Sequence, residues 1–230
     1  MILSPTSETA MSYSREEWEN TYRRGDQDIR WPWSNVVSYA MNYVRPRSGL
    51  RVLELGCGSG ANIPFFRSMG CEYHSIEGSP TCVERIWGAY PDLREHVHLG
   101  DFTRAIPIAG QFDLIFDRGA LTCNTTTAIR DALVIVHGKL KPSGKYIGID
   151  WFSTQDAEFQ RGEPAEDPNT RTGYVEGGFA GQGRIHFSDA VHIMDLFQQF
   201  TMIALRHTVT KAELPRDGLQ HASWNLVAEK

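Results

Sequence analysis

The sequence predicts an α/β fold built on a mostly parallel sheet. Three observations support this class. Strand-like runs alternate with helix-like runs from about residue 50 to residue 152, a glycine-rich segment joins the first strand to the first helix, and no internal repeat interrupts the pattern. The chain has 230 residues, of which 41% are hydrophobic and 22% charged, so it can bury a sizeable core and is most simply one domain.

The first strand, helix and strand are predicted over residues 50–77. Residues 50–55, Leu-Arg-Val-Leu-Glu-Leu, indicate a buried strand, which is followed by glycines and then by a helix over 62–69 that ends at Gly70. A second strand covers 72–77. This order is typical of a βαβ unit, whose two strands lie parallel.

The alternation continues to residue 151. Ser79 and Pro80 supply a capping residue and a proline at the first helical position for a helix that runs to about Tyr90. A short third strand covers 97–99. The remaining elements are a fourth strand over 111–116, a crossover helix over 126–138 and a fifth strand over 145–151 after a Lys-Pro-Ser-Gly turn.

The one domain, residues 1–230, divides into four parts. Residues 1–45 form an N-terminal helical cap, 48–152 the core, 153–186 an insertion, and 187–230 a C-terminal helix followed by a β hairpin. The insertion is rich in glycine and has too little apolar periodicity for a regular element, and a loop of that length is commonly a lid.

The C-terminal part carries both a helical and a β pattern. Ser188 is predicted to cap a helix that runs through Gln199. Its apolar face is predicted from Val191, Met194 and Phe197. Two β-rich runs follow, residues 202–210 and 223–228, and we expect them to pair antiparallel.

Composition excludes several partners. The net charge of −5 provides no diffuse basic field for phosphates, so nucleic acid is disfavoured, and no run approaches the roughly 18 apolar residues of a membrane span. The N-terminus has no basic, apolar leader, which predicts a cytoplasmic protein. The four cysteines contain no CxxC pair, so we expect reduced thiols and no metal site.

The glycine loop is the motif that carries chemistry. Residues 54–60 read Glu-Leu-Gly-Cys-Gly-Ser-Gly between a strand and a helix, where backbone amides and the helix N-terminus can approach a ligand closely. Gly56, Gly58 and Ala61 also satisfy the spacing of a dinucleotide fingerprint, and Glu77 is an acid able to hold ribose hydroxyls in either case. The loop alone leaves both cofactors open.

Its neighbours extend the pattern. Glu77 at the tip of the second strand, Gly100-Asp101 after the third and Phe112-Asp113 opening the fourth complete an ordered set that resembles the class I S-adenosylmethionine-dependent methyltransferases over about residues 48–152. That resemblance implies a Rossmann-like three-layer sandwich, with a mostly parallel seven-stranded sheet closed by an antiparallel C-terminal strand. It also implies S-adenosyl-L-methionine as the cofactor.

The resemblance implies roles for particular residues. The glycine loop would pack against the methionine part of the cofactor, Glu77 would hold the ribose hydroxyls, and Asp101, with Phe102 beside it, would lie near the adenine amine. The predicted cofactor-binding residues are Glu54, Gly56, Cys57, Gly58, Gly60, Glu77, Gly78, Asp101, Phe102, Asp117, Trp18 and Tyr22. An acidic loop suits a cationic sulfonium better than a pyrophosphate, which independently favours S-adenosylmethionine.

Within this class, residues 112–121 look like the fourth-strand region of the thiopurine and tellurite-resistance methyltransferases. Trp18 and Tyr22, at helical i, i+4 spacing, match the aromatic N-terminal helix of that group. The resemblance implies a small-molecule acceptor, with this helix folded over the cofactor. The chain lacks the Pro-Pro tetrad after the fourth strand that is typical of amino methyltransferases acting on nucleic acid bases, having Asp-Arg-Gly-Ala at 117–120 instead.

Three residues are candidates for catalysis. Asp117 and Arg118 follow the fourth strand, where an α/β sheet presents ligands, although an internal ion pair is an equal alternative. His186, beyond the insertion, has a side chain whose ordinary pKa suits a general base near neutral pH. Trp151 is a further acceptor-site candidate by position.

The sequence thus predicts a cytoplasmic S-adenosylmethionine-dependent methyltransferase that acts on an O, N or S atom of a small molecule. Residues 11–35 and 153–186 form its lid. A protein-modifying methyltransferase, a nicotinamide-dependent oxidoreductase and a non-catalytic cofactor-binding module are the alternatives. We expect a monomer or homodimer, with neither a nucleic acid nor a membrane partner.

Overall fold

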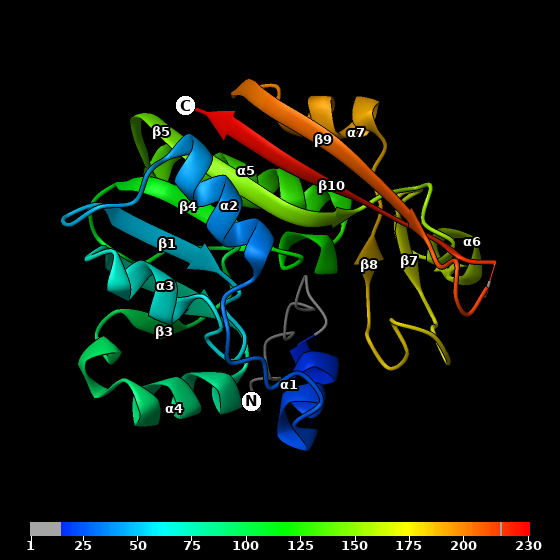
Figure 1. Ribbon diagram of the computed structural model, residues 1–230, viewed down its shortest axis with the longest axis horizontal. Coiled ribbons are helices and arrows are strands. Elements are labelled where there is room, and N and C mark those ends of the chain that lie inside the picture. Colours follow the sequence, from blue (N-terminus) through cyan, green and yellow to red (C-terminus); the bar gives the residue numbers. More distant parts are fainter. Residues whose placement is uncertain (1–14, 217) are drawn as a thin grey trace, which may run out of the picture.

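A seven-stranded sheet forms the centre of the computed structural model, with strand order β3-β2-β1-β4-β5-β10-β9 (Figure 1). The model describes residues 15–216 and 218–230, so residues 1–14 of the predicted cap lie outside the described part. The strands of this sheet are β1 (Arg51–Leu55), β2 (Glu72–Glu77), β3 (Val97–Leu99), β4 (Phe112–Arg118), β5 (Leu140–Phe152), β9 (Thr201–Lys211) and β10 (Gln220–Glu229).

The sheet has the predicted topology. β1 pairs parallel with β2 and β4, β2 with β3, and β4 with β5. The C-terminal strand β10 runs antiparallel to both β5 and β9. The mostly parallel sheet with an antiparallel C-terminal strand, and the pairing of the last two β-rich runs, are therefore confirmed.

Helices cover both faces of the sheet, which gives the predicted three layers (Figure 1). The described helices are α1 (Arg15–Arg24), α2 (Ser34–Tyr43), α3 (Ile63–Ser68), α4 (Pro80–Ala89), η1 (Pro91–Leu93), η2 (Leu121–Cys123), α5 (Thr126–Lys139), α6 (Glu158–Arg161) and α7 (Ala190–Leu196). Buried side chains of α2, α3 and α4 pack in one apolar cluster and those of α5 and α7 in another. Strands β1, β2, β4, β5, β9 and β10 contribute to both clusters because successive side chains alternate between the faces.

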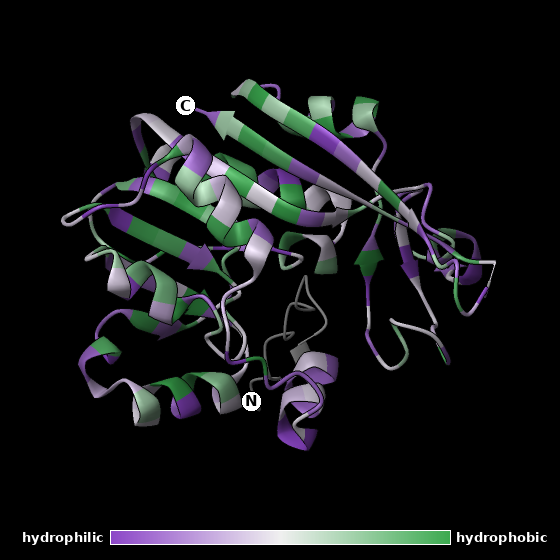
Figure 2. Ribbon diagram, viewed as in Figure 1, coloured by the Kyte–Doolittle hydropathy of each residue, from purple (hydrophilic) through white to green (hydrophobic). Residues whose placement is uncertain are grey.

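Burial of both faces explains the composition of the central strands. Four of the five residues of β1 are buried, and Figure 2 shows hydrophobic residues along β1 and β4. β9 lies at the edge of the sheet, and its residues are mixed in hydropathy and mostly exposed. The central strands are thus more hydrophobic than the edge strand, as expected for a parallel sheet that is covered on both faces.

The predicted helix starts are present at α4 and α5. The Ser79 hydroxyl accepts a hydrogen bond from the Cys82 amide, and Pro80 is the first helical residue. Thr125 caps α5 in the same way. These side chains satisfy amides that have no partner within the helix.

Helix α7 corrects the sequence prediction. It begins after Asp189, not Ser188, and Val191 and Met194 are exposed by 77% and 49%. Asp189 accepts a hydrogen bond from the backbone of the third residue beyond it, which sets the start of the helix. The side chains buried on this segment are Ile193, Leu196 and Phe197.

The insertion is also more regular than predicted. It contains α6 and a three-stranded antiparallel sheet of β6 (Glu163–Pro164), β7 (Thr170–Thr172) and β8 (Ile185–His186). A separate apolar cluster of its aromatic residues stabilises it. Those of the insertion are Phe159, Tyr174 and Phe179, which pack with Phe152 and Phe187 at its two ends, and their irregular spacing leaves no period to detect in the sequence.

Among the described residues, no helix is long and apolar enough to cross a membrane. The carboxyl ends of β1, β2, β3 and β4 meet at one edge of the sheet, and α1 lies beside that edge (Figure 1). In an open α/β sheet this edge is where ligands bind.

Candidate active site

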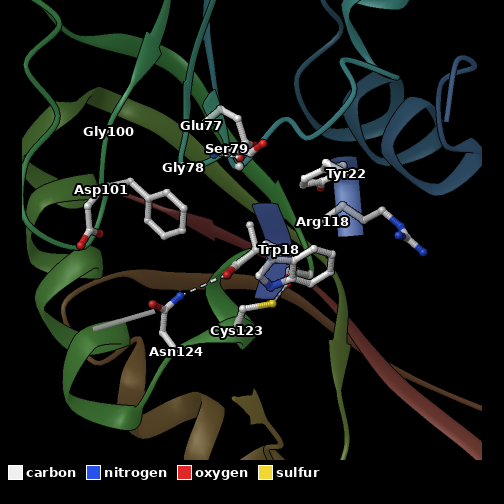
Figure 3. Close-up of a pocket in the computed structure, with 14 residues that line it drawn as sticks. Trp18, Tyr22, Glu77, Gly78, Ser79, Gly100, Asp101, Arg118, Cys123 and Asn124 are labelled. Atoms are coloured by element: carbon white, nitrogen blue, oxygen red, sulfur yellow. Dashed lines mark hydrogen bonds between the residues drawn. The ribbon is translucent and has the colours of Figure 1, made fainter. Parts of the chain in front are cut away.

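A pocket lies at this edge, beneath α1 (Figure 3). Its walls come from α1 and from the loops that follow β1, β2, β3 and β4. The lining residues are Trp18, Tyr22, Gly56, Glu77, Gly78, Ser79, Gly100, Asp101, Phe102, Arg118, Gly119, Ala120, Cys123 and Asn124. Eight of these were predicted as site residues, so strands distant in sequence bring these eight together.

Two glycines of the glycine loop lie at positions where a side chain could not fit. Gly56 and Gly58 have φ values of +66° and +52°, which residues with a Cβ rarely adopt. A Cβ at Gly56 would lie 2.6 Å from the Cβ of Ala120, and one at Gly58 would lie 2.6 Å from the Tyr22 hydroxyl. The loop is therefore held close to both the β4 loop and α1.

Glu77 ends β2 in the wall of the pocket. Its Oε2 accepts a hydrogen bond of 2.7 Å from the Gly58 amide, and its Oε1 accepts one of 2.8 Å from the Ser79 amide. Burial raises the pKa of Glu77, while these amides act to lower it. Since each carboxylate oxygen has two lone pairs, Glu77 keeps acceptor capacity for a pair of hydroxyls.

Asp101 and Phe102 form the wall after β3. Asp101 Oδ1 accepts hydrogen bonds from the Thr103 amide and hydroxyl at 2.9 and 2.6 Å, and Arg104 lies 3.4 Å from Oδ2. Phe102 also lines the pocket. The loop thus presents an acid and an aromatic ring side by side.

Helix α1 covers the pocket with two aromatic side chains. Trp18 and Tyr22 lie one turn apart with ring centroids 5.8 Å from each other, and both line the pocket. Burial and the nearby Glu77 carboxylate raise the pKa of Tyr22 well above its ordinary value, so its hydroxyl stays protonated. The structure therefore places the aromatic helix at the pocket, as the sequence predicted.

Glu19 attaches α1 to the start of α4. Its carboxylate accepts hydrogen bonds of 2.6 Å from each of the Ser79 and Thr81 hydroxyls. Burial acts to raise the pKa of Glu19, but these hydrogen bonds outweigh it and the pKa is lowered. A carboxylate at a helix N-terminus is also favoured by the helix dipole, so this contact stabilises the covering position of α1.

Arg118 does not present its charge to the pocket. Its guanidinium points away from the other lining residues (Figure 3), and its Nε donates a 2.9 Å hydrogen bond to Asp150. The guanidinium also lies 3.5 Å from the centroid of the Trp33 ring. This geometry is against the predicted catalytic role and favours a role in anchoring the segment before α2.

Asp117 is fully buried and is not among the lining residues. Its Oδ1 accepts hydrogen bonds from the Tyr146 hydroxyl and the Trp151 indole, and its Oδ2 accepts from the amides of Ala120 and Leu121. With four donors bound, the carboxylate holds the β4 loop in shape rather than facing a ligand. Trp151, the predicted acceptor-site candidate, is likewise fully buried.

The structure places His186, the predicted general base, away from the pocket. It is fully buried in β8, lies 3.2 Å from the Thr170 hydroxyl and 3.1 Å from His192, and does not line the pocket. Burial lowers its pKa to about 3, which makes it a poor base at neutral pH. The prediction of a catalytic His186 therefore has no support in the geometry.

Three further predicted residues support the loop from behind. Glu54 is buried and accepts hydrogen bonds from Asn62 and Tyr73. A Cβ at Gly60 would meet Ile63 at 2.8 Å, so this glycine is needed for packing and not for ligand contact. Cys57 is also buried outside the lining set, and burial raises the pKa of its thiol.

Sequence reasoning missed the lining residues just beyond β4, above all Cys123 and Asn124. The Cys123 thiol lies 3.3 Å from the Gly119 carbonyl, and burial raises its pKa to about 12, so it stays a thiol. The signal was available, because both residues follow a strand end at a point where the strand order reverses. The predicted site residues at the end of β4 were Asp117 and Arg118, and none beyond Arg118 was predicted in this loop.

A possible metal-binding group lies at the opposite end of β2. Glu72, His74 and His96 have potential ligand atoms within 4.8 Å of one another, although the sequence predicted no metal site. The Arg51 guanidinium lies 3.0 Å from Glu72 and 3.3 Å from His74 Nε2. The positive charge of the Arg51 guanidinium already balances the Glu72 carboxylate, which disfavours the binding of a metal ion there.

Comparison with known proteins supports the interpretation of the pocket. Residues 52–144, less than half of the chain, match a family model described as a methyltransferase domain. No curated protein matches the sequence.

Solved structures show the same fold. A SAM-dependent methyltransferase from Methanosarcina mazei aligns with a TM-score of 0.66 at 14% identity, over 87% of this chain and 98% of the other. A 1,6-didemethyltoxoflavin-N1-methyltransferase from Burkholderia thailandensis aligns with a TM-score of 0.63 at 16% identity, over 100% and 93%. TehB from Haemophilus influenzae gives 0.60 at 12% identity, over 92% and 67%.

The chain thus matches a methyltransferase domain over residues 52–144 and has the fold of solved S-adenosylmethionine-dependent methyltransferases, in agreement with the predicted class. The Burkholderia structure contains bound S-adenosylhomocysteine, in agreement with the predicted cofactor.

Proposed function

We propose that this protein transfers the methyl group of S-adenosylmethionine to a nitrogen or sulfur atom of a small molecule. The observation that carries the proposal is the closure of the pocket by α1. Trp18 and Tyr22 cover the carboxyl edge of the sheet, and Glu19 holds their helix in place. A covered pocket excludes water and suits a compact acceptor better than a folded surface.

The lining residues fit the cofactor. Glu77 would accept hydrogen bonds from the ribose hydroxyls, Asp101 would lie at the adenine amine, and Gly56, which lines the pocket without a side chain, would lie against the methionine part. When bound, the cofactor supplies an electrophilic methyl group on a sulfonium. Trp18 and Tyr22 offer aromatic faces to a cation, which such a ring attracts.

The protein's part in the reaction is to hold and orient. Methyl transfer is an in-line displacement at carbon, so the acceptor atom must lie opposite the leaving sulfur with water excluded. Among the described lining residues no histidine is present, and Cys123 is a protonated thiol. An acceptor that is nucleophilic without losing a proton to the site, such as a neutral amine or a thiolate, therefore fits this pocket better than a hydroxyl, which gains from a general base.

Two structures with the same fold agree with a small acceptor by their descriptions. One is the Burkholderia enzyme with bound 1,6-didemethyltoxoflavin and S-adenosylhomocysteine, and another is from echinomycin biosynthesis. At 16% identity each shares the fold with this chain. Their descriptions indicate that the fold accommodates such molecules.

A protein acceptor is the second candidate, and one observation favours it. A further groove runs between α1 and the insertion, lined by Glu17, Ala165, Glu166, Thr172, Gly183 and Arg184. An extended peptide could lie along it. The acidic and basic side chains of this groove would then select the peptide sequence.

Two measurements test the proposal. Calorimetric titration with S-adenosylmethionine and with S-adenosylhomocysteine should show micromolar binding of both, and no binding of either by folded protein would refute the site. Incubation with methyl-labelled cofactor and a cell extract, divided by ultrafiltration, should then place the label in a low-mass product that chromatography separates from the unreacted cofactor. Label confined to protein would refute the small-molecule acceptor and favour the groove. Glu84→Gln, an exposed change on α4, is the matched control.

A further inference from the structure

Asn124 is a fully buried residue in the wall of the pocket. It lies between η2 and the cap of α5. Its Nδ2 donates hydrogen bonds of 3.1 Å to the carbonyls of Ala120 and Leu121. Its Oδ1 is buried and, within the described part of the chain, has no hydrogen-bond partner.

The orientation of the Asn124 amide is fixed by its donors. Rotating the amide by half a turn would place Oδ1 against two carbonyl oxygens and remove both hydrogen bonds. The unpartnered atom is therefore the oxygen. A buried acceptor without a donor is costly, and such groups in folded proteins are expected to gain a partner.

The surroundings limit what that partner can be. Asn124 lines the pocket together with Trp18 (Figure 3) and Phe102. The neighbouring Asp101 already accepts two hydrogen bonds from Thr103, whereas Asn124 Oδ1 accepts none from the described residues. A planar group with an N–H donor would satisfy the oxygen and stack on the aromatic walls.

We infer that Asn124 Oδ1 accepts a hydrogen bond from an amino group on a planar ring bound in this pocket. This inference rests on the proposed function and deepens it. The ring has two possible sources, the adenine of the cofactor or a nitrogen-bearing methyl acceptor. Either source makes Asn124 a residue that selects an amino group over a methyl group or a hydrogen.

Matched ligand pairs test the inference in the full-length protein. The first pair is S-adenosylhomocysteine and its analogue in which hydrogen replaces the purine amine. The second pair, offered to protein saturated with S-adenosylhomocysteine, is 2-aminopyridine and 2-methylpyridine. Each pair is titrated into the wild type, Asn124→Leu and Thr122→Val.

The variants separate ligand contact from loop support. Asn124→Leu removes the free oxygen together with two hydrogen bonds inside the loop. Thr122→Val removes a loop hydrogen bond to the Gly119 carbonyl at a buried position outside the lining set. A merely structural role weakens both members of a pair equally, so only a change in preference within a pair reports the contact.

We expect the wild type and Thr122→Val to prefer the amino member of one pair by roughly threefold to tenfold, and Asn124→Leu to lose that preference. Preference within the first pair assigns the contact to adenine, and preference within the second assigns it to the acceptor. Equal preference in the wild type and Asn124→Leu, or none in either pair, overturns the inference alone. Absence of S-adenosylhomocysteine binding by folded wild type overturns the proposed function and this inference with it.

Discussion

Replacing Glu54 by glutamine should change how the stability of the protein depends on pH. Glu54 is 2% exposed in β1, directly before the glycine loop. Its oxygens accept hydrogen bonds of 2.8 Å from Asn62 and 2.5 Å from the Tyr73 hydroxyl. Burial nevertheless outweighs these bonds and raises the pKa of Glu54 from 4.5 to about 7.

The sign of the effect follows from the two pKa values. Below pH 4.5 the side chain is protonated in both the folded and the unfolded chain. Between pH 4.5 and about 7 the unfolded chain ionises while the folded chain keeps its proton, so the free energy of unfolding falls by about 1.4 kcal/mol per pH unit. Above pH 7 the loss from this group is complete at about 3 kcal/mol.

Glu54→Gln keeps the shape of the side chain but cannot ionise. We expect the free energy of unfolding of the variant, minus that of the wild type, to rise by about 3 kcal/mol between pH 4.5 and 8. Urea denaturation at several pH values measures this difference, and the exposed Glu84→Gln controls for the change in net charge. A difference that stays constant, or that falls with pH, would show that burial does not control the ionisation of Glu54.

Three further predictions concern the site. Glu77→Ala should weaken binding of S-adenosylhomocysteine at least about a hundredfold, since charge-assisted hydrogen bonds to two hydroxyls are lost; unchanged affinity by calorimetry would remove Glu77 from the site. Glu19→Gln should loosen α1, raising the same Kd roughly threefold to tenfold and speeding cleavage within α1 by trypsin; equal cleavage rates would refute the anchoring role. Asp117→Asn should lower the free energy of unfolding by about 3 kcal/mol, because an NH2 group would face bound donors; a loss below about 1 kcal/mol in urea denaturation would contradict this.

Local patterns predicted the elements whose determinants are local. β2 and β3 occupy the predicted residues, and Ser79 caps α4 as expected, because a buried apolar run or a capping side chain acts within a few residues. The predicted start of helix α7 was wrong because two neighbouring residues, Ser188 and Asp189, are both good caps. Only the packing of the helix against the sheet decides between them.

The chemistry of the site depended more on tertiary partners. Asp117 was correctly placed at the end of β4, but its hydrogen bonds come from Tyr146 and Trp151, which lie 29 and 34 residues further along the chain. Because its oxygens accept hydrogen bonds from these donors, Asp117 has a structural role instead of the predicted catalytic one. Asn124 was missed for the complementary reason, since its importance lies in a hydrogen bond that the rest of the described chain does not provide.

The glycine spacing that also fits a dinucleotide fingerprint is resolved by one contact. In a dinucleotide-binding loop, the free amides at the helix N-terminus bind a pyrophosphate. Here the Gly58 amide donates to Glu77 Oε2 at 2.7 Å, so a carboxylate occupies the position where a phosphate would need a donor. A phosphate at this loop would lose an amide and meet a negative charge, whereas ribose hydroxyls and a sulfonium would gain from the same carboxylate. The contact between Gly58 and Glu77 therefore disfavours the nicotinamide alternative on electrostatic grounds alone.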